Sequence, residues 1–102
     1  MSIDPKVLAQ VQQSLKRLAR IAPGKAIEVR IPPYGAIQCG SGGVHRRGTP
    51  PNVVEMDAQT WLALVSGELN WEAGINQGLV AASGIRADLS TFLPLPSESN
   101  PG

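Results

Sequence analysis

The sequence predicts an α+β domain with an N-terminal helix, a small, mainly antiparallel sheet of four to five strands, and helices packed on one face of that sheet. Three observations support this fold class. An apolar stripe at helical spacing opens the chain, an alternating segment follows it, and the second half divides into short segments that end at glycines. A chain of 102 residues is one domain with a modest core. We place this domain at residues 1–96 and a disordered tail at 97–102.

A helix is expected between Asp4 and Ala22. Asp4 suits the N-cap, and Pro5 suits the first helical position, where its missing N–H costs nothing. The apolar stripe recurs at steps of three and four residues and consists of Leu8, Val11, Leu15, Leu18 and Ala22. The last turns carry the basic residues Lys16, Arg17 and Arg20. We interpret them as a solvated face near the negative end of the helix dipole, the alternative being transient contact with a membrane surface or an acidic partner.

Three strands are expected next. Residues Ala26–Ile31 alternate between apolar and charged side chains, which is typical of a half-buried strand. Tyr34–Cys39 is predicted to pair with it as a hairpin, because the intervening prolines cannot continue a central ladder. Val53–Met56 is the third expected strand.

The second half predicts short elements separated by glycines. Asp57 is expected to cap a helix that ends at a glycine and whose apolar side chains are Trp61, Leu62, Leu64 and Val65. Asn70 is expected to cap a shorter helix, from Trp71 to about Gln77. Leu79–Ser83 reads as a strand. A last helix is expected after Gly84, with the apolar residues Leu89, Phe92 and Leu93.

Composition argues against several classes of protein. A net charge of +1 and four aromatic residues give no basis for nucleic-acid binding. No apolar run approaches the roughly 18 residues of a membrane span. The N-terminus lacks the apolar core of a signal peptide, and a single cysteine cannot form an internal disulfide. We therefore expect a cytoplasmic protein.

The sequence contains no recognisable arrangement of catalytic residues, so we expect that the protein is not an enzyme. The glycines of the 40–43 loop lack the spacing of a phosphate-binding motif. A nucleophilic Cys39 would need a base within hydrogen-bond reach, and the spacing to His45 does not show one, so we interpret Cys39 as a small core residue. One histidine and one cysteine do not make a zinc site, and the carboxylates are scattered. We expect no catalytic residue, metal or cofactor.

The proline-rich loop from His45 to Asn52 is the strongest local candidate for a polar contact. It places the only histidine beside Arg46 and Arg47, and arginine binds carboxylates and phosphates through two parallel hydrogen bonds. One hypothesis is therefore that His45, Arg46 and Arg47 contact an anion or a ligand headgroup. The alternative is that the arginines pair with carboxylates such as Glu28 or Glu55 and fix the turn.

The segment Asp57–Leu95 resembles the sterol carrier protein type 2 superfamily. Its pattern is matched by Asp57, Leu62, Leu64, Gly67, Ala73, Gly78, Gly84 and Leu89. The strings Arg-Gly-Thr-Pro-Pro-Asn-Val-Val-Glu, Trp-Leu-x-Leu, Ser-Gly-x-Arg-Ala-Asp-Leu-Ser and Leu-Pro-Leu look like a small actinobacterial sterol-carrier-like family. They are also similar to the C-terminal domain of mycothiol-dependent maleylpyruvate isomerase-like proteins. The resemblance implies a non-catalytic module.

This resemblance implies that an apolar or amphipathic small molecule, such as a lipid, fatty acyl chain or sterol, binds between the sheet and the helices. The candidate ligand-binding residues are Trp61, Leu64, Val65, Trp71, Ile75, Val80, Leu89 and Phe92. Both tryptophans are also good core residues, and the two roles are compatible. The alternative function is an accessory protein-interaction domain that keeps the fold without a lipid tunnel, joining a protein partner or forming a homo-oligomer.

Overall fold

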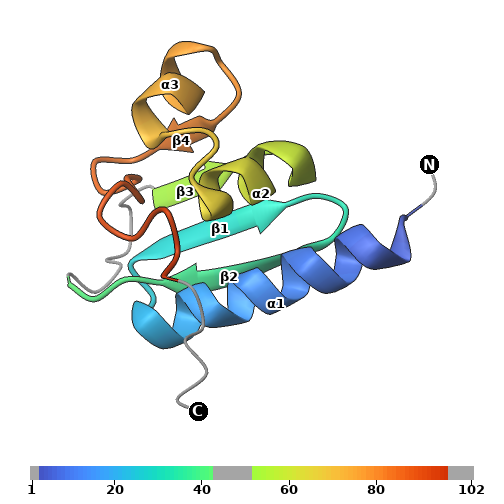
Figure 1. Cartoon of the computed structure of the whole chain (residues 1–102). Coiled ribbons are helices and arrows are strands. Elements are labelled where there is room, and N and C mark those ends of the chain that lie inside the picture. Colours follow the sequence, from blue (N-terminus) through green and yellow to red (C-terminus); the bar gives the residue numbers. More distant parts are fainter. Residues whose placement is uncertain (1–2, 43–51, 97–102) are drawn as a thin grey trace.

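The computed structural model describes residues 3–42 and 52–96. Helix α1 comes first, three strands follow, and two short helices and a fourth strand complete the order (Figure 1). The elements are α1 (Pro5–Ile21), β1 (Ile27–Ile31), β2 (Gly35–Cys39), β3 (Asn52–Glu55), α2 (Ala58–Ser66), α3 (Trp71–Asn76) and β4 (Ala81–Ser83). The α+β class is confirmed. The predicted tail at 97–102 lies outside the described residues.

Helix α1 forms where its cap and apolar stripe predict it. The carboxylate of Asp4 accepts a hydrogen bond of 2.8 Å from the backbone N–H of Lys6, which satisfies one of the free donors at the helix start. The helix buries Val11, Ser14, Leu15 and Leu18. Helix α1 therefore lies with its apolar stripe against the rest of the core, and the polar face is left to solvent.

The sheet is mixed, with the strand order β2-β1-β3-β4. Strand β1 pairs antiparallel with β2, so that Ile27 lies opposite Cys39, and β4 pairs antiparallel with β3. The central pair, β1 and β3, is parallel, with Val29 opposite Val54. Two of the three pairings are thus antiparallel, which agrees with the predicted sheet.

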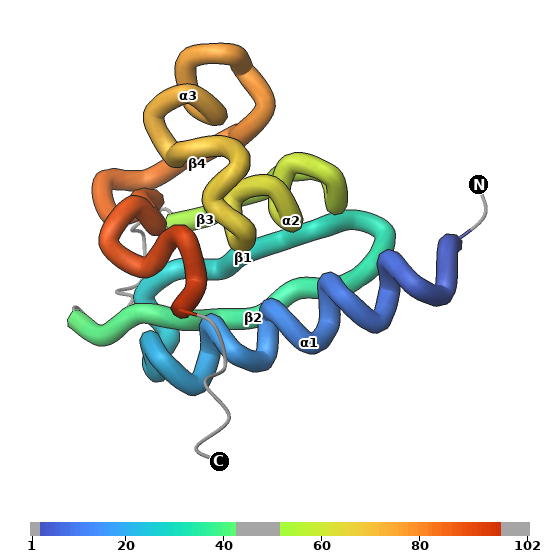
Figure 2. The backbone as a smooth tube through the Cα atoms, viewed as in Figure 1, coloured from blue at the N-terminus to red at the C-terminus, as the bar shows by residue number. Residues whose placement is uncertain are grey.

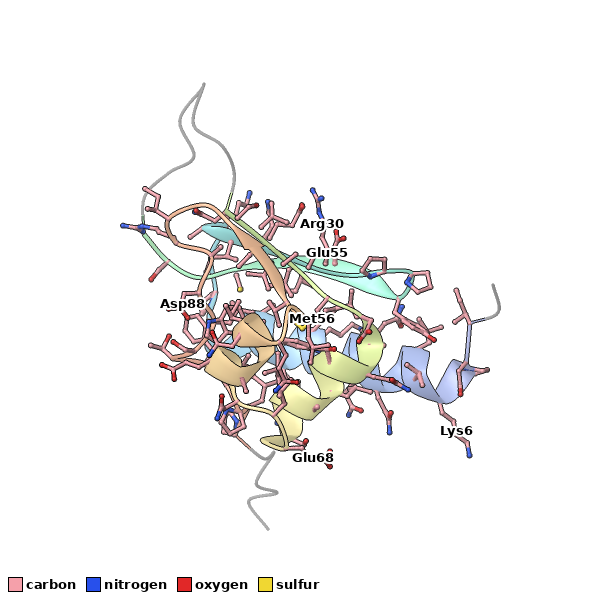
Figure 3. The ribbon with its side chains drawn as sticks, turned by 90° about the horizontal axis from the view of Figure 1, so that it is seen from above. Lys6, Arg30, Glu55, Met56, Glu68 and Asp88 are labelled. Carbon is pink, nitrogen blue, oxygen red and sulfur yellow. The ribbon has the colours of Figure 1, made fainter. Side chains whose placement is uncertain are left out.

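One face of the sheet carries the helices. Along β1 the side chains of Ile27, Val29 and Ile31 are buried, while Arg30 is exposed on the other face and pairs with Glu28. Figure 3 shows the sheet edge-on, with the helices below it and Arg30 and Glu55 on the other side. The alternation along β1 therefore separates a core face from a polar face, as the sequence predicted.

The expected last helix is wrong: residues after β4 form successive turns. The carboxylate of Asp88 accepts a hydrogen bond of 2.8 Å from the backbone N–H of Ser90, a local bond that competes with helix formation. Pro94 follows closely and cannot supply a helical N–H. The turns instead place Leu89 and Leu95 in the core, where they are 0% and 6% exposed.

Candidate functional site

The eight candidate ligand-binding residues fall into two groups. Trp61, Leu64, Leu89 and Val80 belong to the core and are at most 6% exposed. Val65, Trp71 and Phe92 are half-buried and pack against the core, and Ile75 is exposed. The core group is closed off from solvent, so only the second group offers surface to an incoming molecule.

Trp61 is held in the core by a polar contact as well as by packing. Its indole Nε1 donates a hydrogen bond of 2.8 Å to the hydroxyl of Ser14 on α1. That hydroxyl lies 2.8 Å from the carbonyl oxygen of Gln10, to which it donates in turn. Within residues 3–42 and 52–96, every buried side-chain nitrogen or oxygen has a hydrogen-bond partner. Trp61 therefore reads as a structural residue that joins α2 to α1.

Trp71 lines an open hollow of about 360 Å³, which we call the Trp71 hollow. Its apolar walls are Leu69, from the connection between α2 and α3, Trp71, the first residue of α3, and Leu93 and Pro94, from the turns after β4. Its polar lining is Asn70, Glu72 and Ser90. Of the eight predicted residues, the hollow includes Trp71. The sequence analysis did not single out Leu69, Leu93 and Pro94 as ligand contacts.

The C-terminal turns pack against the end of α2 at Gly67. Gly67 ends α2 with a positive φ of 89°, and a Cβ at this position would lie 3.5 Å from Pro94. The backbone N–H of Leu95 donates a hydrogen bond of 3.2 Å to the carbonyl of Val65 on α2. The end of α2 and the last turns are therefore joined directly, and Leu93 and Pro94 are held beside Trp71.

Helix α3 brings the indole of Trp71 to the hollow. The side chain of Asn70 caps the helix by accepting a hydrogen bond of 2.8 Å from the N–H of Ala73. The buried Gly74 allows close packing, since a Cβ there would lie 3.1 Å from Val80 and 3.5 Å from Leu69. Figure 2 shows α3 projecting beyond α2, on the side away from α1. The opposite side of this short helix is left to solvent.

A second hollow, of about 510 Å³, lies between α1 and α2. Most of the residues that line it are polar and include Gln10, Gln13, Arg17, Gln59 and Glu68, with Leu62 and Val65 as apolar contributors. Arg17 also donates a hydrogen bond to the carbonyl of Pro96. Val65 is thus separated from Trp71: the two predicted residues line different hollows.

A family comparison agrees with this arrangement of helices, sheet and core. Residues 5–95 match a family model described as Bacterial SCP ortholog. The chain belongs to this bacterial sterol-carrier-like family. No curated protein gave a significant match. The finer resemblance to a domain of maleylpyruvate isomerase-like proteins stays a prediction, as does the actinobacterial origin.

Cys39 of this sterol-carrier-like chain is a buried free thiol at the end of β2. Burial disfavours the thiolate and raises the pKa of Cys39 from 9.0 to about 11. A reactive cysteine has the opposite property, a lowered pKa and access to solvent. The structure therefore places Cys39 among the core residues.

The remaining predicted residues, His45, Arg46 and Arg47, lie outside the described residues, so the anion-site hypothesis stays a prediction. Among residues 3–42 and 52–96, no three histidine, cysteine or carboxylate side chains gather as a metal site would require. In the same part of the sterol-carrier-like chain, no helix combines the length and apolar character needed to span a bilayer.

Proposed function

We propose that this sterol-carrier-like protein binds an apolar or amphipathic small molecule without chemical conversion, and that the Trp71 hollow receives its apolar part. The family match over residues 5–95 supports binding of this kind. A volume of about 360 Å³ lies within the usual range of ligand pockets, about 300–1,000 Å³. The observation that carries the proposal is that Leu69, Trp71 and Leu93 meet at an open hollow while each is only partly buried.

The energetics agree with an open site. An enclosed dry void of about 300 Å³ would cost roughly 7 kcal/mol, a large share of the about 5–15 kcal/mol by which domains are stable. The Trp71 hollow avoids this cost because it is open at the surface. A ligand that removes roughly 300 Å² of combined apolar surface from water gains about 7 kcal/mol before the costs of association. A net 7 kcal/mol would correspond to a dissociation constant of about 10 μM, so after the costs of association we expect weaker binding than this.

The test is a titration with the neutral apolar probe N-phenyl-1-naphthylamine, whose fluorescence rises on leaving water. We expect saturable binding to the wild-type chain, and a loss of about tenfold or more in affinity for Trp71→Ala, because the substitution removes the largest apolar wall. Leu62→Ala is the matched control, since Leu62 is half-buried and lines the groove between α1 and α2. Circular dichroism establishes that both variants are folded.

Equal binding by the wild type and Trp71→Ala would overturn the placement of the site. No binding by the folded wild type, with no lipid retained in native mass spectrometry after gentle purification, would overturn the proposed function. The accessory protein-interaction role would then be the function to examine.

A further inference from the structure

The charges of this chain are divided unevenly along the sequence. Eight of the nine basic residues come before Gly48, and no lysine or arginine occurs between Gly48 and Ile85. That same stretch has four carboxylate residues, Glu55, Asp57, Glu68 and Glu72. The Trp71 hollow is built largely from this acidic stretch, through residues 67–72.

One carboxylate belongs to the lining of the Trp71 hollow. Glu72 belongs to its lining and is exposed, so its charge faces the solvent from which a ligand arrives. Glu68, on the helix side of the sheet (Figure 3), lines the hollow between α1 and α2 instead. The described lining of the hollow contains no lysine or arginine. The one charged side chain in this lining is therefore the carboxylate of Glu72, beside an apolar floor.

A basic side chain of α1 lines the other hollow, between α1 and α2. Arg17 lines the groove between α1 and α2 and donates a hydrogen bond to the carbonyl of Pro96. Helix α3, which begins at Trp71, lies beyond α2, on the side away from α1 (Figure 2). Exposed charges more than about 10 Å apart are largely screened at physiological ionic strength. Glu72, which lines the hollow, therefore acts there more strongly than the more distant charges that give the chain its net charge of +1.

We propose that the Trp71 hollow selects amphiphiles with a cationic head, such as a quaternary or primary ammonium, over those with a carboxylate head. This inference rests on the proposed function. The apolar tail would contact Leu69, Leu93 and Pro94. The ammonium would lie near the indole of Trp71, whose negative ring face attracts cations, and near the carboxylate of Glu72. A carboxylate head meets repulsion at both groups.

Three probes with the same dodecyl chain separate the effect of the head from that of the tail: dodecyltrimethylammonium, dodecanol and dodecanoate. Displacement of N-phenyl-1-naphthylamine from the wild-type chain measures each affinity, with the two charged probes kept below micelle formation and dodecanol kept below its solubility limit. We expect the ammonium to bind about five- to tenfold more tightly than dodecanoate, with dodecanol between them, as exposed charge pairs and one cation–π contact allow. The preference should shrink as salt is added.

Two variants assign the preference to its residues. Glu72→Gln should reduce the ratio of ammonium to carboxylate affinity about two- to fourfold and leave dodecanol binding unchanged. Trp71→Leu keeps an apolar wall and should lower the ammonium affinity more than that of dodecanol. Glu55→Gln is the control, because Glu55 is exposed on the open face of the sheet (Figure 3), and this substitution should leave all three affinities unchanged.

The outcomes separate the two proposals. If dodecanol and the naphthylamine probe both fail to bind, the proposed function fails. If all three dodecyl probes bind equally, only the head selection fails. Tighter binding of dodecanoate than of the ammonium would also overturn the head selection. If the Arg46→Gln/Arg47→Gln variant then lost that binding, the carboxylate head of dodecanoate would be assigned to the anion site predicted from the sequence.

Discussion

The indole Nε1 of Trp61 donates a hydrogen bond of 2.8 Å to the hydroxyl of Ser14, across the buried contact between α2 and α1. Ser14 is 4% exposed and lies within the apolar stripe of α1. A serine in such a stripe looks like an interruption of the core. Here it supplies the acceptor that allows a large aromatic side chain to be fully buried.

We expect Ser14→Ala to lower the free energy of unfolding by about 1–3 kcal/mol, because it leaves the buried indole N–H without an acceptor. Urea unfolding followed by tryptophan fluorescence measures the change. Ser66→Ala is the control, since Ser66 is exposed at the end of α2, and it should stay within about 0.5 kcal/mol of the wild type.

Ser14→Ala should destabilise the protein less when Trp61 has already been replaced. In a Trp61→Phe background there is no N–H to satisfy, so Ser14→Ala should cost at least about 1 kcal/mol less than it does in the wild type. Additive effects in this double-mutant cycle would show that the hydrogen bond contributes nothing to stability.

The raised pKa of Cys39 predicts that the protein loses stability at alkaline pH. Its pKa is raised to about 11 by burial, so the thiol stays protonated in the folded chain at pH values where the unfolded chain ionises. The associated stability is present below pH 9 and decreases between about pH 9 and 11, by up to roughly 2–3 kcal/mol. Comparing urea midpoints at pH 7.5 and 10.5, we expect the wild type to lose more than Cys39→Ala. Equal losses would contradict the role of Cys39.

Gly84 and Gly78 can be compared as mutation sites, because both have a positive φ, of 101° and 73° respectively. A Cβ on Gly78 would meet nothing within 4 Å, whereas a Cβ on Gly84 would lie 2.8 Å from the Cα of Asn52. Gly78→Ala should therefore cost about 1–2 kcal/mol of backbone strain alone. Gly84→Ala should cost at least about 1 kcal/mol more, because β3 must also move. Thermal unfolding of the two variants gives the comparison, and a larger effect at Gly78 would contradict it.

Removing the Asn70 cap should cause local unfolding of α3 rather than global unfolding of the domain. Removing the cap of a six-residue helix should cost about 1 kcal/mol, and this helix is held by few buried side chains. We expect Asn70→Ala to raise amide hydrogen exchange across α3 several-fold, with only a small change in the melting temperature. Asn76→Ala, at the other end of α3, is the control. Unchanged exchange in Asn70→Ala would mean that packing alone holds the helix.

Local signals predicted most of the elements correctly. The carboxylates of Asp4 and Asp57 cap α1 and α2 as expected, because such caps depend on residues within one turn. The alternation of β1 predicted its buried face. The prediction of a last helix was wrong for a local reason as well. The apolar spacing of Leu89 and Phe92 is compatible with a helix, but the turn at Asp88 and the prolines that follow are not.

The candidate site was harder to predict, because a surface hollow depends on how elements meet. Trp61 and Trp71 look alike in the sequence, each near the start of a capped helix. One is 0% exposed and bonded to Ser14, and the other is half-buried beside Leu93. The sequence analysis missed Leu69 as a candidate contact. It is an apolar residue between the glycine that ends α2 and the cap of α3.

The sequence by itself determined the α+β class, the caps, the glycine stops, the core face of β1 and the resemblance to a sterol-carrier-like family, since each depends on short-range pattern and chemistry. The tertiary structure alone decided the parallel pairing of β1 with β3, the bond between Trp61 and Ser14, and the hollow around Trp71. These features join segments far apart in the chain. Their energy comes from contacts that exist only after the elements have packed, and no local pattern encodes them.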